Sequence, residues 1–242
     1  NKIYTHGFYR LYQASYDEDE MGSVLAINSD PIGIPITYCG YFLLFISLIW
    51  ILIDKKGGYR KLLKRSWQQF RNLLIVVFSL VGIGFIYLIY HFSHIDFSDG
   101  EHAPILNSPY FCVHVSVIMM SYVLLMLTCI SGIMGICWRS RRERMQDLSR
   151  LFLYPALTTM GLGIFIGAIW ANVSWGTYWS WDSKETWALI TFMIYAVVVH
   201  TQSLPVFRKP LIYHIYISLA FLSIAMTYFG VNFFLTGMHS YA

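Results

Sequence analysis

The sequence predicts an all-α integral membrane protein with six transmembrane helices and a short extracytoplasmic β fragment at its N-terminus. Hydrophobic residues make up 57% of the 242 residues, and charged residues only 12%. The mean hydropathy is +0.53, a value that excludes a soluble domain of ordinary composition. Apolar segments recur at close to the length of about 20 residues that crosses about 30 Å of hydrocarbon as a helix.

The first 33 residues differ from the rest in being polar and rich in tyrosine. Side chains alternate in strand fashion at Tyr9, Leu11 and Gln13, and again at Val24 and Ala26, on either side of an acidic turn at 17–22. This period of two predicts a β-hairpin or a fragment of a sheet. Such a hairpin is marginally stable alone and needs a packing partner.

Six apolar segments follow, and each is predicted to span the membrane as a helix. They are Ile32–Ile53, Leu73–Phe92, Phe111–Cys137, Leu151–Trp170, Trp187–Leu204 and Leu211–Leu235. The connections alternate in charge, because 55–71, 139–150 and 208–209 together hold fourteen of the seventeen Lys and Arg. By the positive-inside rule that side is cytoplasmic. Both termini and the segment between the fourth and fifth spans are then extracytoplasmic.

The basic connections do not indicate nucleic acid, since topology and anionic lipid are sufficient causes beside membrane helices. The four cysteines, Cys39, Cys112, Cys129 and Cys137, lie in or beside apolar segments. They form no C-x-x-C or C-x-x-C-H pattern. The sequence therefore predicts no disulfide framework, no zinc site and no haem bound covalently to this chain.

The segment Trp170–Trp187 holds five of the eight tryptophans, in W-A-N-V-S-W-G-T-Y-W-S-W-D-S-K-E-T-W. An interfacial belt explains two or three such rings. Five tryptophans with Tyr178 exceed that need, and they predict a platform for a flat apolar ligand on a partly irregular loop. Asp182 and Glu185 have the spacing of a capping box, which predicts a helix start after the loop.

The run W-G-T-Y-W-S-W-D-S-K-E-T-W-A-L-I-T resembles the tryptophan-rich WWD signature of haem-handling membrane proteins, in the form of the CcsA (ResC) family of cytochrome c biogenesis system II. The related CcmC family continues differently after the aspartate. This sequence departs from the family form at Ser183, where proline is usual. The resemblance implies that haem b is the substrate and is presented to apocytochrome c, whose CXXCH thiols form the thioether bonds.

The run Tyr12–Tyr41 resembles the end of ResB (CcsB), the companion of CcsA. Residue 1 is Asn rather than Met. We therefore expect the C-terminal part of a fused ResB–CcsA synthase. Residues 1–33 would be the end of the ResB extracytoplasmic domain, 34–71 its last helix and a basic linker, and 72–242 the CcsA-like membrane domain. The cytochrome c synthase activity would require the ResB part, and thiol-reducing proteins are further possible partners.

Two histidines are predicted at the depth of the tryptophan-rich segment. His114 lies near the outer end of the third span, and His239 just beyond the outer end of the sixth. Topology alone leaves open whether they are two unrelated interfacial histidines. The resemblance implies that both are axial ligands of one haem iron, since imidazole is a common iron ligand. Residues 116–122 and F-G-V-N-F-F-L-T-G-M-H-S-Y-A carry this part of the resemblance.

His200 lies thirteen residues along the fifth span from Trp187, which places it about 20 Å from the outer boundary. The resemblance implies that it ligates a second, inner haem, with a histidine of ResB as its partner. His214 is the alternative partner within this chain. An ionisable residue at such depth indicates function by default.

These observations give one hypothesis: haem export across a bacterial inner membrane and delivery on its periplasmic side. The predicted haem-binding residues are His114, His239, His200, Trp170, Trp175, Tyr178, Trp179, Trp181, Asp182 and Trp187. The alternatives are a cytochrome b-like electron-transfer subunit, a CcmC-type delivery protein and a scaffold or transporter without haem.

Overall fold

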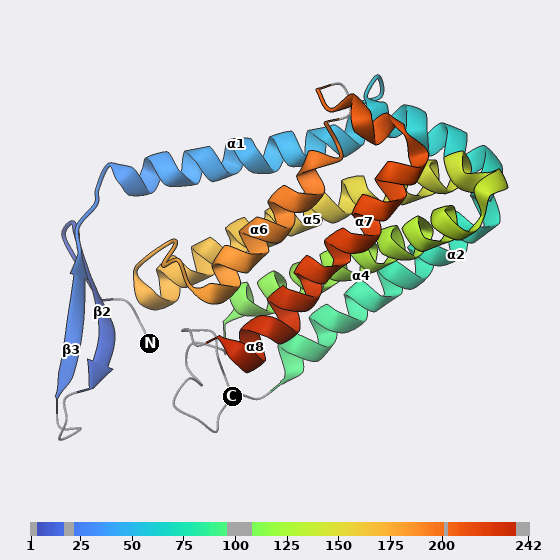
Figure 1. The fold of residues 1–242 in the computed structure, drawn as a ribbon. Helices are drawn as coiled ribbons and strands as arrows, with labels where there is room; N and C mark the ends of the chain where they lie inside the picture. The colour runs from blue at the N-terminus through green and yellow to red at the C-terminus, as the bar shows by residue number, and fades with distance from the viewer. Residues whose placement is uncertain (1–3, 17–21, 96–107, 201–202, 236–242) are drawn as a thin grey trace.

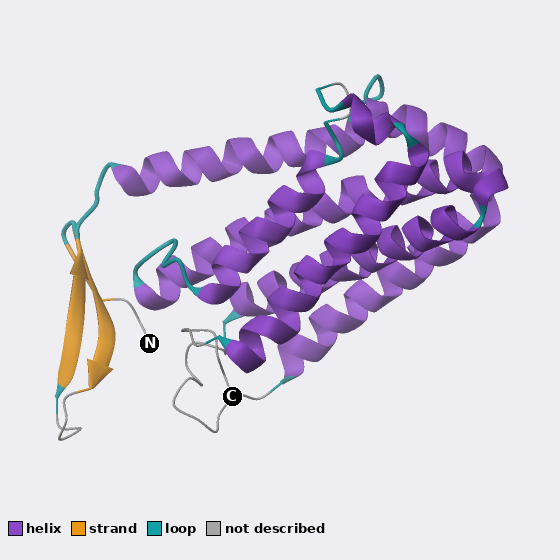
Figure 2. Ribbon diagram, in the orientation of Figure 1, coloured by secondary structure: helices purple, strands orange, loops and turns teal. Residues whose placement is uncertain are grey.

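The computed structural model describes residues 4–16, 22–95, 108–200 and 203–235. Long helices run back and forth along one common direction, and a small sheet lies beyond one end (Figure 1). Figure 2 shows that loops are confined to the two ends. The helices are α1 (Gly33–Ile53), α2 (Gly58–His94), α4 (Pro109–Cys137), α5 (Arg142–Trp175), α6 (Ser183–Val197) and α7 (Pro210–Ala225). Short helical turns are Arg139–Arg141 and Pro205–Arg208.

The predicted N-terminal β fragment is confirmed. Strands β1 (Tyr4–His6), β2 (Tyr9–Tyr16) and β3 (Ser23–Asn28) form an antiparallel sheet in the order β1-β2-β3. The acidic turn that joins β2 to β3 lies for the most part outside the described residues. A β-bulge between Gln13 and Ser15 shifts the register of β2 on β3. Gly7 has φ of 59°, which suits the tight turn between β1 and β2.

Four helical stretches are long and apolar enough to cross a membrane: Gly33–His94, Pro109–Cys137, Arg139–Ser174 and Pro210–Phe234. The first holds both α1 and α2, which are joined by a short turn. The predicted span Trp187–Leu204 was wrong in its bounds, because α6 covers Ser183–Val197. Its fifteen residues reach about 22 Å, less than the hydrocarbon thickness of about 30 Å.

Two further helices begin earlier than predicted. Helix α2 starts at Gly58 rather than Leu73, with a kink at Phe70 (φ −130°, ψ 22°). Helix α5 starts at Arg142 rather than Leu151. Charged residues begin both helices, so hydropathy alone places the starts too late. These polar turns pack against each other, because Leu62 is buried and Arg65 pairs with Asp147 of α5.

The main core lies between α4, α5, α6 and α7. It includes Leu125, Met160, Tyr195 and Ile217, which are all 0% exposed to solvent. By contrast, none of the 21 residues of α1 is buried, although the helix is apolar around its circumference. A helix that is apolar on every side requires lipid or another protein around it. Helix α1 therefore stands at the edge of the bundle.

The last helix changes its winding before it ends. Helix α7 passes into a π-helical turn at Met226–Gly230 and then into α8 (Val231–Phe234). The predicted sixth span, Leu211–Leu235, thus agrees in extent but not in regularity. Single π-helical turns occur often at functional sites. This one lies at the same end of the bundle as the tryptophan-rich loop (Figure 1).

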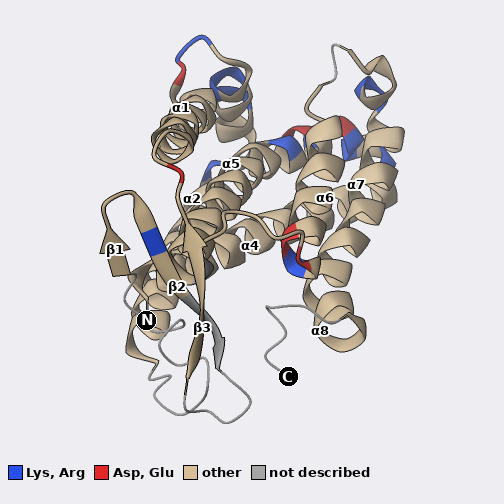
Figure 3. Ribbon diagram, turned by 90° about the vertical axis from the view of Figure 1, so that its left-hand side faces the viewer, with Lys and Arg blue, Asp and Glu red and all other residues tan. Residues whose placement is uncertain are grey.

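Charged side chains separate along the bundle. Lys and Arg gather at the end that holds the α1–α2, α4–α5 and α6–α7 connections (Figure 3). The other end has few Lys or Arg among the described residues and includes the acidic start of α6. The described helices therefore place the predicted cytoplasmic connections together, as the charge pattern requires.

Candidate ligand site

The tryptophan-rich segment is part helix and part loop. Helix α5 continues through Trp175 and ends at Gly176, whose φ of 81° is left-handed and whose N–H donates to the Asn172 carbonyl at 3.1 Å. Glycine suits this C-terminal position because it has no Cβ. The loop then reaches Asp182 with one further positive φ, 58° at Trp181. The predicted irregular segment is therefore confirmed only for 176–182.

The predicted capping box is confirmed. The Asp182 carboxylate accepts from the Lys184 N–H at 3.1 Å, and Glu185 accepts from the Asp182 N–H at 3.3 Å. Glu185 also accepts from the N–H and the hydroxyl of Ser180 at 2.8 and 3.2 Å. These bonds satisfy donors at the start of α6 and fix the loop conformation. The Asp182 side chain is accordingly buried as a helix cap.

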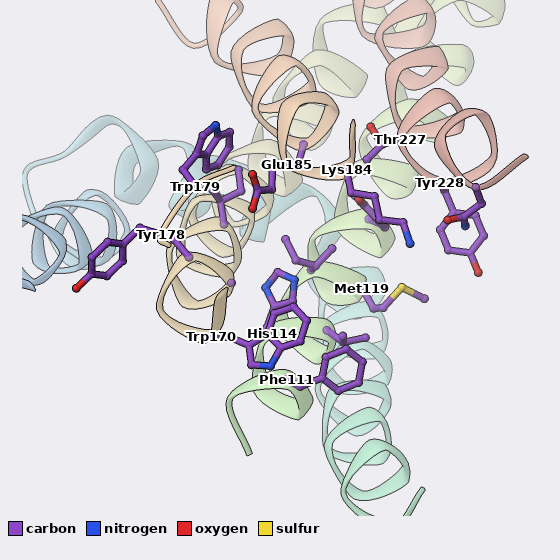
Figure 4. A pocket seen from close by; sticks show the side chains of 18 residues that line it. Phe111, His114, Met119, Trp170, Tyr178, Trp179, Lys184, Glu185, Thr227 and Tyr228 are labelled. Atoms are coloured by element: carbon purple, nitrogen blue, oxygen red, sulfur yellow. The ribbon is translucent and has the colours of Figure 1, made fainter. Parts of the chain in front are cut away.

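A cavity of about 300 Å³ lies beside this loop, between α4, α5, α6 and the π-helical turn with α8. Figure 4 shows His114, Trp170 and Phe111 on one side of it and Lys184, Thr227 and Tyr228 on another. Its walls are mostly apolar, as in ligand sites generally. The lining residues are Phe111, His114, Val115, Ile118, Met119, Tyr122, Ile164, Gly167, Ala168, Trp170, Tyr178, Trp179, Lys184, Glu185, Ala188, Thr227, Tyr228 and Asn232.

His114 is held in one orientation against α5. Its Nδ1 lies 2.8 Å from the carbonyl oxygen of Gly163, so Nδ1–H donates this bond and Nε2 is the basic nitrogen. The imidazole stacks on Trp170 with ring centres 6.1 Å apart and an interplanar angle of 14°. A Cβ at Gly167 would come within 2.5 Å of Cε1 of His114. Glycine at 167 therefore allows the ring to approach the helix.

The aromatic residues of the segment play different structural parts. Trp170 is only 1% exposed and packs between His114 and Phe111. Trp170 therefore belongs to a packed helix rather than to the predicted irregular loop, because α5 extends beyond it. Trp179 and Tyr178 line the cavity from the loop. Tyr178 packs on Tyr38 of α1 with ring centres 6.0 Å apart.

A second cavity, also of about 300 Å³, adjoins the first. Gly161, Ile164, Phe165, Trp179, Trp181, Leu189 and Phe192 line it. Ile164 and Trp179 line both cavities, so these two side chains form a shared wall. Trp181 is 72% exposed and meets Trp179 edge to face, with ring centres 5.8 Å apart.

Several predicted residues lie elsewhere or outside the described structure. Trp187 does not line either cavity; its carbonyl accepts from the Thr227 hydroxyl at 3.3 Å. The side chain of Trp175 and the whole of His239 fall outside the described residues. Among the residues that are described, no cluster of three or more His, Cys, Asp or Glu could hold a metal ion. His114 is the one histidine among the described residues that line the first cavity.

His200 and His214 lie at the other end of the bundle. His200 follows the end of α6, is exposed, and has Nδ1 2.9 Å from the Ala196 carbonyl. The expectation of a histidine inside the fifth helix was wrong, because 3₁₀-type bonds such as His200 N–H to Val197 O end the helix first. His214 is fully buried on α7, with Nε2 2.9 Å from the Arg142 carbonyl.

Sequence reasoning undervalued Lys184 and missed Tyr122, Thr227 and Tyr228. The sequence analysis assigns no role to Lys184, but its side chain is only partly exposed and lines the cavity. Burial lowers the pKa of its ammonium group, and the nearby Asp182 partly opposes this shift. The sequence signal that could have identified Lys184 was its position two residues after the capping Asp182, in the first turn of α6. Thr227 and Tyr228 are brought in by the π-helical turn, which no sequence pattern revealed.

The N-terminal sheet contacts the loop at Gly176. The side-chain amide of Asn28 in β3 donates to the Gly176 carbonyl at 3.1 Å. Tyr12 of β2 is 4% exposed, and a Cβ at Gly176 would come within 2.8 Å of its ring. The sheet thus finds in this loop the packing partner that an isolated hairpin lacks.

Comparison with known proteins gives concordant matches. The family model described as "Cytochrome C assembly protein" matches residues 41–239. Protein NrfI of Wolinella succinogenes is 34% identical over 203 residues, 76% of this chain and 22% of NrfI. The cytochrome c biogenesis protein CcsA of Guillardia theta is 33% identical over 171 residues, 57% of this chain and 56% of that protein. CcsA of Pyropia yezoensis is 49% identical over 90 residues, 36% of this chain and 26% of that protein. The matches thus cover 22–56% of these relatives' lengths.

Proposed function

This chain belongs to the cytochrome c assembly protein family, and on that premise we propose that it presents haem to apocytochrome c in c-type cytochrome biogenesis. The cavity beside the tryptophan-rich loop is the site of presentation. Haem b is the substrate, and the thiols of a CXXCH motif are the second reactant. The activity belongs to the complete protein, including a ResB portion, fused or separate.

One observation carries this proposal: an imidazole with a fixed tautomer in an aromatic cavity. The Gly163 carbonyl holds the Nδ1–H of His114 at 2.8 Å, and this leaves Nε2 as the basic nitrogen for iron. A hydrogen bond to the second ring nitrogen orients such ligands and raises their basicity. Packing on Trp170 and Gly167 keeps the ring from rotating. Apolar walls favour a porphyrin face over water.

His239 is proposed as the second axial ligand. It lies outside the described residues, and the family resemblance assigns this role. Tyr228 and Asn232 line the cavity, and α8 ends at Phe234, five residues before His239. Five extended residues reach at most about 18 Å, so this connection is long enough to return to the cavity. Iron held between two imidazoles would have both axial positions filled and limited access to oxidants.

The loop aromatics would position the porphyrin for its reaction. Trp179 and Tyr178 line the cavity, while Trp181 stays exposed near its rim, where an incoming peptide would approach. Each cysteine S–H adds across one vinyl C=C, with sulfur bonding one carbon and hydrogen the other. Such an addition needs mainly alignment of the two reactants. Asp182 would serve indirectly, by capping α6 and fixing the loop.

Haem would enter at an inner site that includes His200. The exposed imidazole lies at the basic end of the bundle, and the family resemblance assigns it a histidine of ResB as partner. The buried His214 is the alternative within this chain. Its Nε2–H donates to the Arg142 carbonyl and its ring packs on Gly135, which favours a structural role for His214.

The chain would lie in a bacterial inner membrane with the tryptophan-rich loop toward the periplasm. The four long apolar stretches support insertion in a membrane. The gathering of Lys and Arg at the opposite end supports this orientation (Figure 3). The all-apolar, unburied surface of α1 would contact lipid or the remaining helices of ResB.

The test compares the visible spectrum of the purified complete protein, expressed with ample haem, before and after His114→Ala combined with His239→Ala. We expect loss of the outer haem signal and of holocytochrome c made by co-expressed apocytochrome, with yield and thermal unfolding retained. His91→Ala is the matched control, because His91 stacks on Tyr87 and does not line the cavity.

Three results would contradict the proposal. A spectrum that the double substitution leaves unchanged would show that His114 and His239 do not ligate the haem iron. Stable haem that cycles with a quinol, without any effect on cytochrome c maturation, would favour the cytochrome b-like alternative. Purification with no Soret absorption at all would favour a scaffold or a transporter.

A further inference from the structure

We propose that the N-terminal sheet is part of the haem site, with Asn28 and Tyr12 as positioning residues. These two side chains hold the start of the loop 176–182, so that Trp179 stays in the wall of the cavity. This inference rests on the proposed function and deepens it, because it makes haem affinity at the outer site depend on the contact between the sheet and the loop.

Side chains from outside the loop hold it at both ends. At the α6 end, Glu185 accepts from the N–H of Ser180 at 2.8 Å. At the α5 end, the side-chain amide of Asn28 donates to the Gly176 carbonyl at 3.1 Å. Trp179 lies between these two bonds and lines both cavities. A displacement of Gly176 would therefore also displace Trp179, which is three residues further along the chain.

The buried residues of the sheet are concentrated at this contact. Five of the six residues of β3 are exposed, and Asn28 is the exception. In β2, Tyr12 is buried, and its ring is so close to Gly176 that a Cβ there would come within 2.8 Å of it. Gly176 also has a left-handed φ of 81°, which other residues adopt only with strain. Two strands thus converge on the one residue at which the loop begins.

The N-terminal region contacts the loop a second time through α1, which begins shortly after β3 ends. Tyr38 and Tyr41 of α1 each meet Tyr178 edge to face, with ring centres 6.0 Å apart in both pairs. Figure 4 shows the Tyr178 side chain extending from the loop toward α1. A displacement of the sheet would therefore also disturb the packing around Tyr178, which precedes Trp179.

Thermodynamic linkage makes this effect reciprocal. If the sheet contact raises the affinity for haem, bound haem must stabilise the sheet contact by the same factor. Hydrogen exchange of the backbone N–H groups in β2 and β3 reports the local opening of these strands. We expect this exchange to be slower in the protein with bound haem than in the protein without it.

The experiment titrates the complete protein, purified without haem, with haem and follows the Soret shift. Asn28→Leu keeps the approximate size of the side chain but removes the N–H donor, and it should weaken haem binding by about threefold to tenfold. Asn28→Gln retains a donor and should restore part of the affinity. In protein that carries Trp179→Ala, Asn28→Leu should change the affinity by less than about twofold, because the residue through which Asn28 acts is absent.

Ile27→Thr is the matched control. Ile27 precedes Asn28 in β3 and is 66% exposed, and consecutive side chains of a strand point to opposite faces. Threonine retains a high preference for strands, so haem affinity and thermal unfolding should both match those of the wild-type protein. Equal losses of affinity in Ile27→Thr and Asn28→Leu would indicate general damage to the sheet and contradict a specific role for Asn28.

The outcomes separate this inference from the function on which it rests. A His114-dependent Soret shift with unchanged affinity in Asn28→Leu would overturn the positioning role and leave the haem site intact, whether or not the unfolding temperature falls. A full effect of Asn28→Leu in protein that carries Trp179→Ala would show that Asn28 does not act through Trp179. Hydrogen exchange that haem leaves unchanged in β2 and β3 would contradict the linkage. Absence of any His114-dependent Soret shift would overturn the proposed function itself.

Discussion

His114 and His214 occupy similar niches at opposite ends of the same bundle. Each packs on a glycine of a neighbouring helix, Gly167 or Gly135, and each has one ring nitrogen bonded to a backbone carbonyl, at 2.8 and 2.9 Å. They differ in the space around them. His114 borders a cavity, whereas His214 is fully buried.

The difference shows that a fixed imidazole becomes a ligand candidate only where space remains beside it. Around His214 the connections are tied together: Gln146 and Arg150 both donate to the Phe207 carbonyl, at 3.1 and 3.0 Å. Beside His114 a cavity lies between the helices, and the loop residues Tyr178 and Trp179 line it. The end of the bundle around His214 is therefore closely packed, whereas the end around His114 has space for a ligand.

The largest effect should come from His114→Gly. Removal of the imidazole should lower haem retention by more than about tenfold, because His114 is the only histidine among the described residues that line the cavity. Added free imidazole should restore part of the Soret band, since it can occupy the vacated space. Failure of imidazole to restore any signal, with the protein still folded, would mean that His114 does not ligate iron.

Gly167→Ala should have the next largest effect. The added methyl would lie 2.5 Å from Cε1 of His114 and would displace the ring from its bond to Gly163, so haem affinity should fall by about tenfold. Gly84→Ala is the matched control, since nothing lies within 4 Å of a Cβ there. That change should preserve haem binding and stabilise α2 slightly. Equal haem affinity in both variants would argue against a positional requirement at His114.

His214→Ala should lower the stability of the protein rather than its affinity for haem. It removes a buried partner of the Arg142 carbonyl, so the protein should lose about 1–3 kcal/mol of stability and unfold at lower temperature. Haem affinity at the outer site should stay within about twofold, because distant sites are nearly independent. A selective loss of bound haem without a fall in the unfolding temperature would instead make His214 a ligand.

The smallest effect should come from Arg65→Met. The ion pair with Asp147 joins α2 to α5, but the Arg65 side chain is 62% exposed, so its loss should cost less than about 1 kcal/mol. Thermal unfolding at low and high salt measures this contribution. A loss of several kcal/mol would show that the basic end depends on charge more than the buried contacts indicate.

The sequence predicted those parts of the fold that hydropathy and local capping control. The N-terminal hairpin, the helices predicted at 32–53 and 111–137, which the structure places at 33–53 and 109–137, and the capping box at Asp182 are confirmed. It failed where helices begin among charged residues, as at Gly58 and Arg142, because apolar content cannot detect a helix start that tertiary contacts support. It also overextended the fifth helix, which ends at Val197 through local 3₁₀-type bonds.

The site could be predicted in part. Topology placed His114 at the depth of the tryptophan-rich segment, and the family resemblance singled it out. The structure brings it beside Trp170, Tyr178 and Trp179. The Gly163 carbonyl and the π-helical turn could not be foreseen. Each depends on how α4, α5 and α7 approach one another, and no single segment encodes that approach.

The bond from Asn28 to Gly176 has a consequence for how this machinery can be divided. Asn28 and Gly176 are 148 residues apart in the chain. Because α1 tethers the sheet to the rest of the bundle, the effective concentration of the sheet at the loop is high. A chain cut between α1 and α2 would turn this contact into a subunit boundary. The fraction of chains in which this contact forms would then depend on the amounts of the two halves that the cell makes.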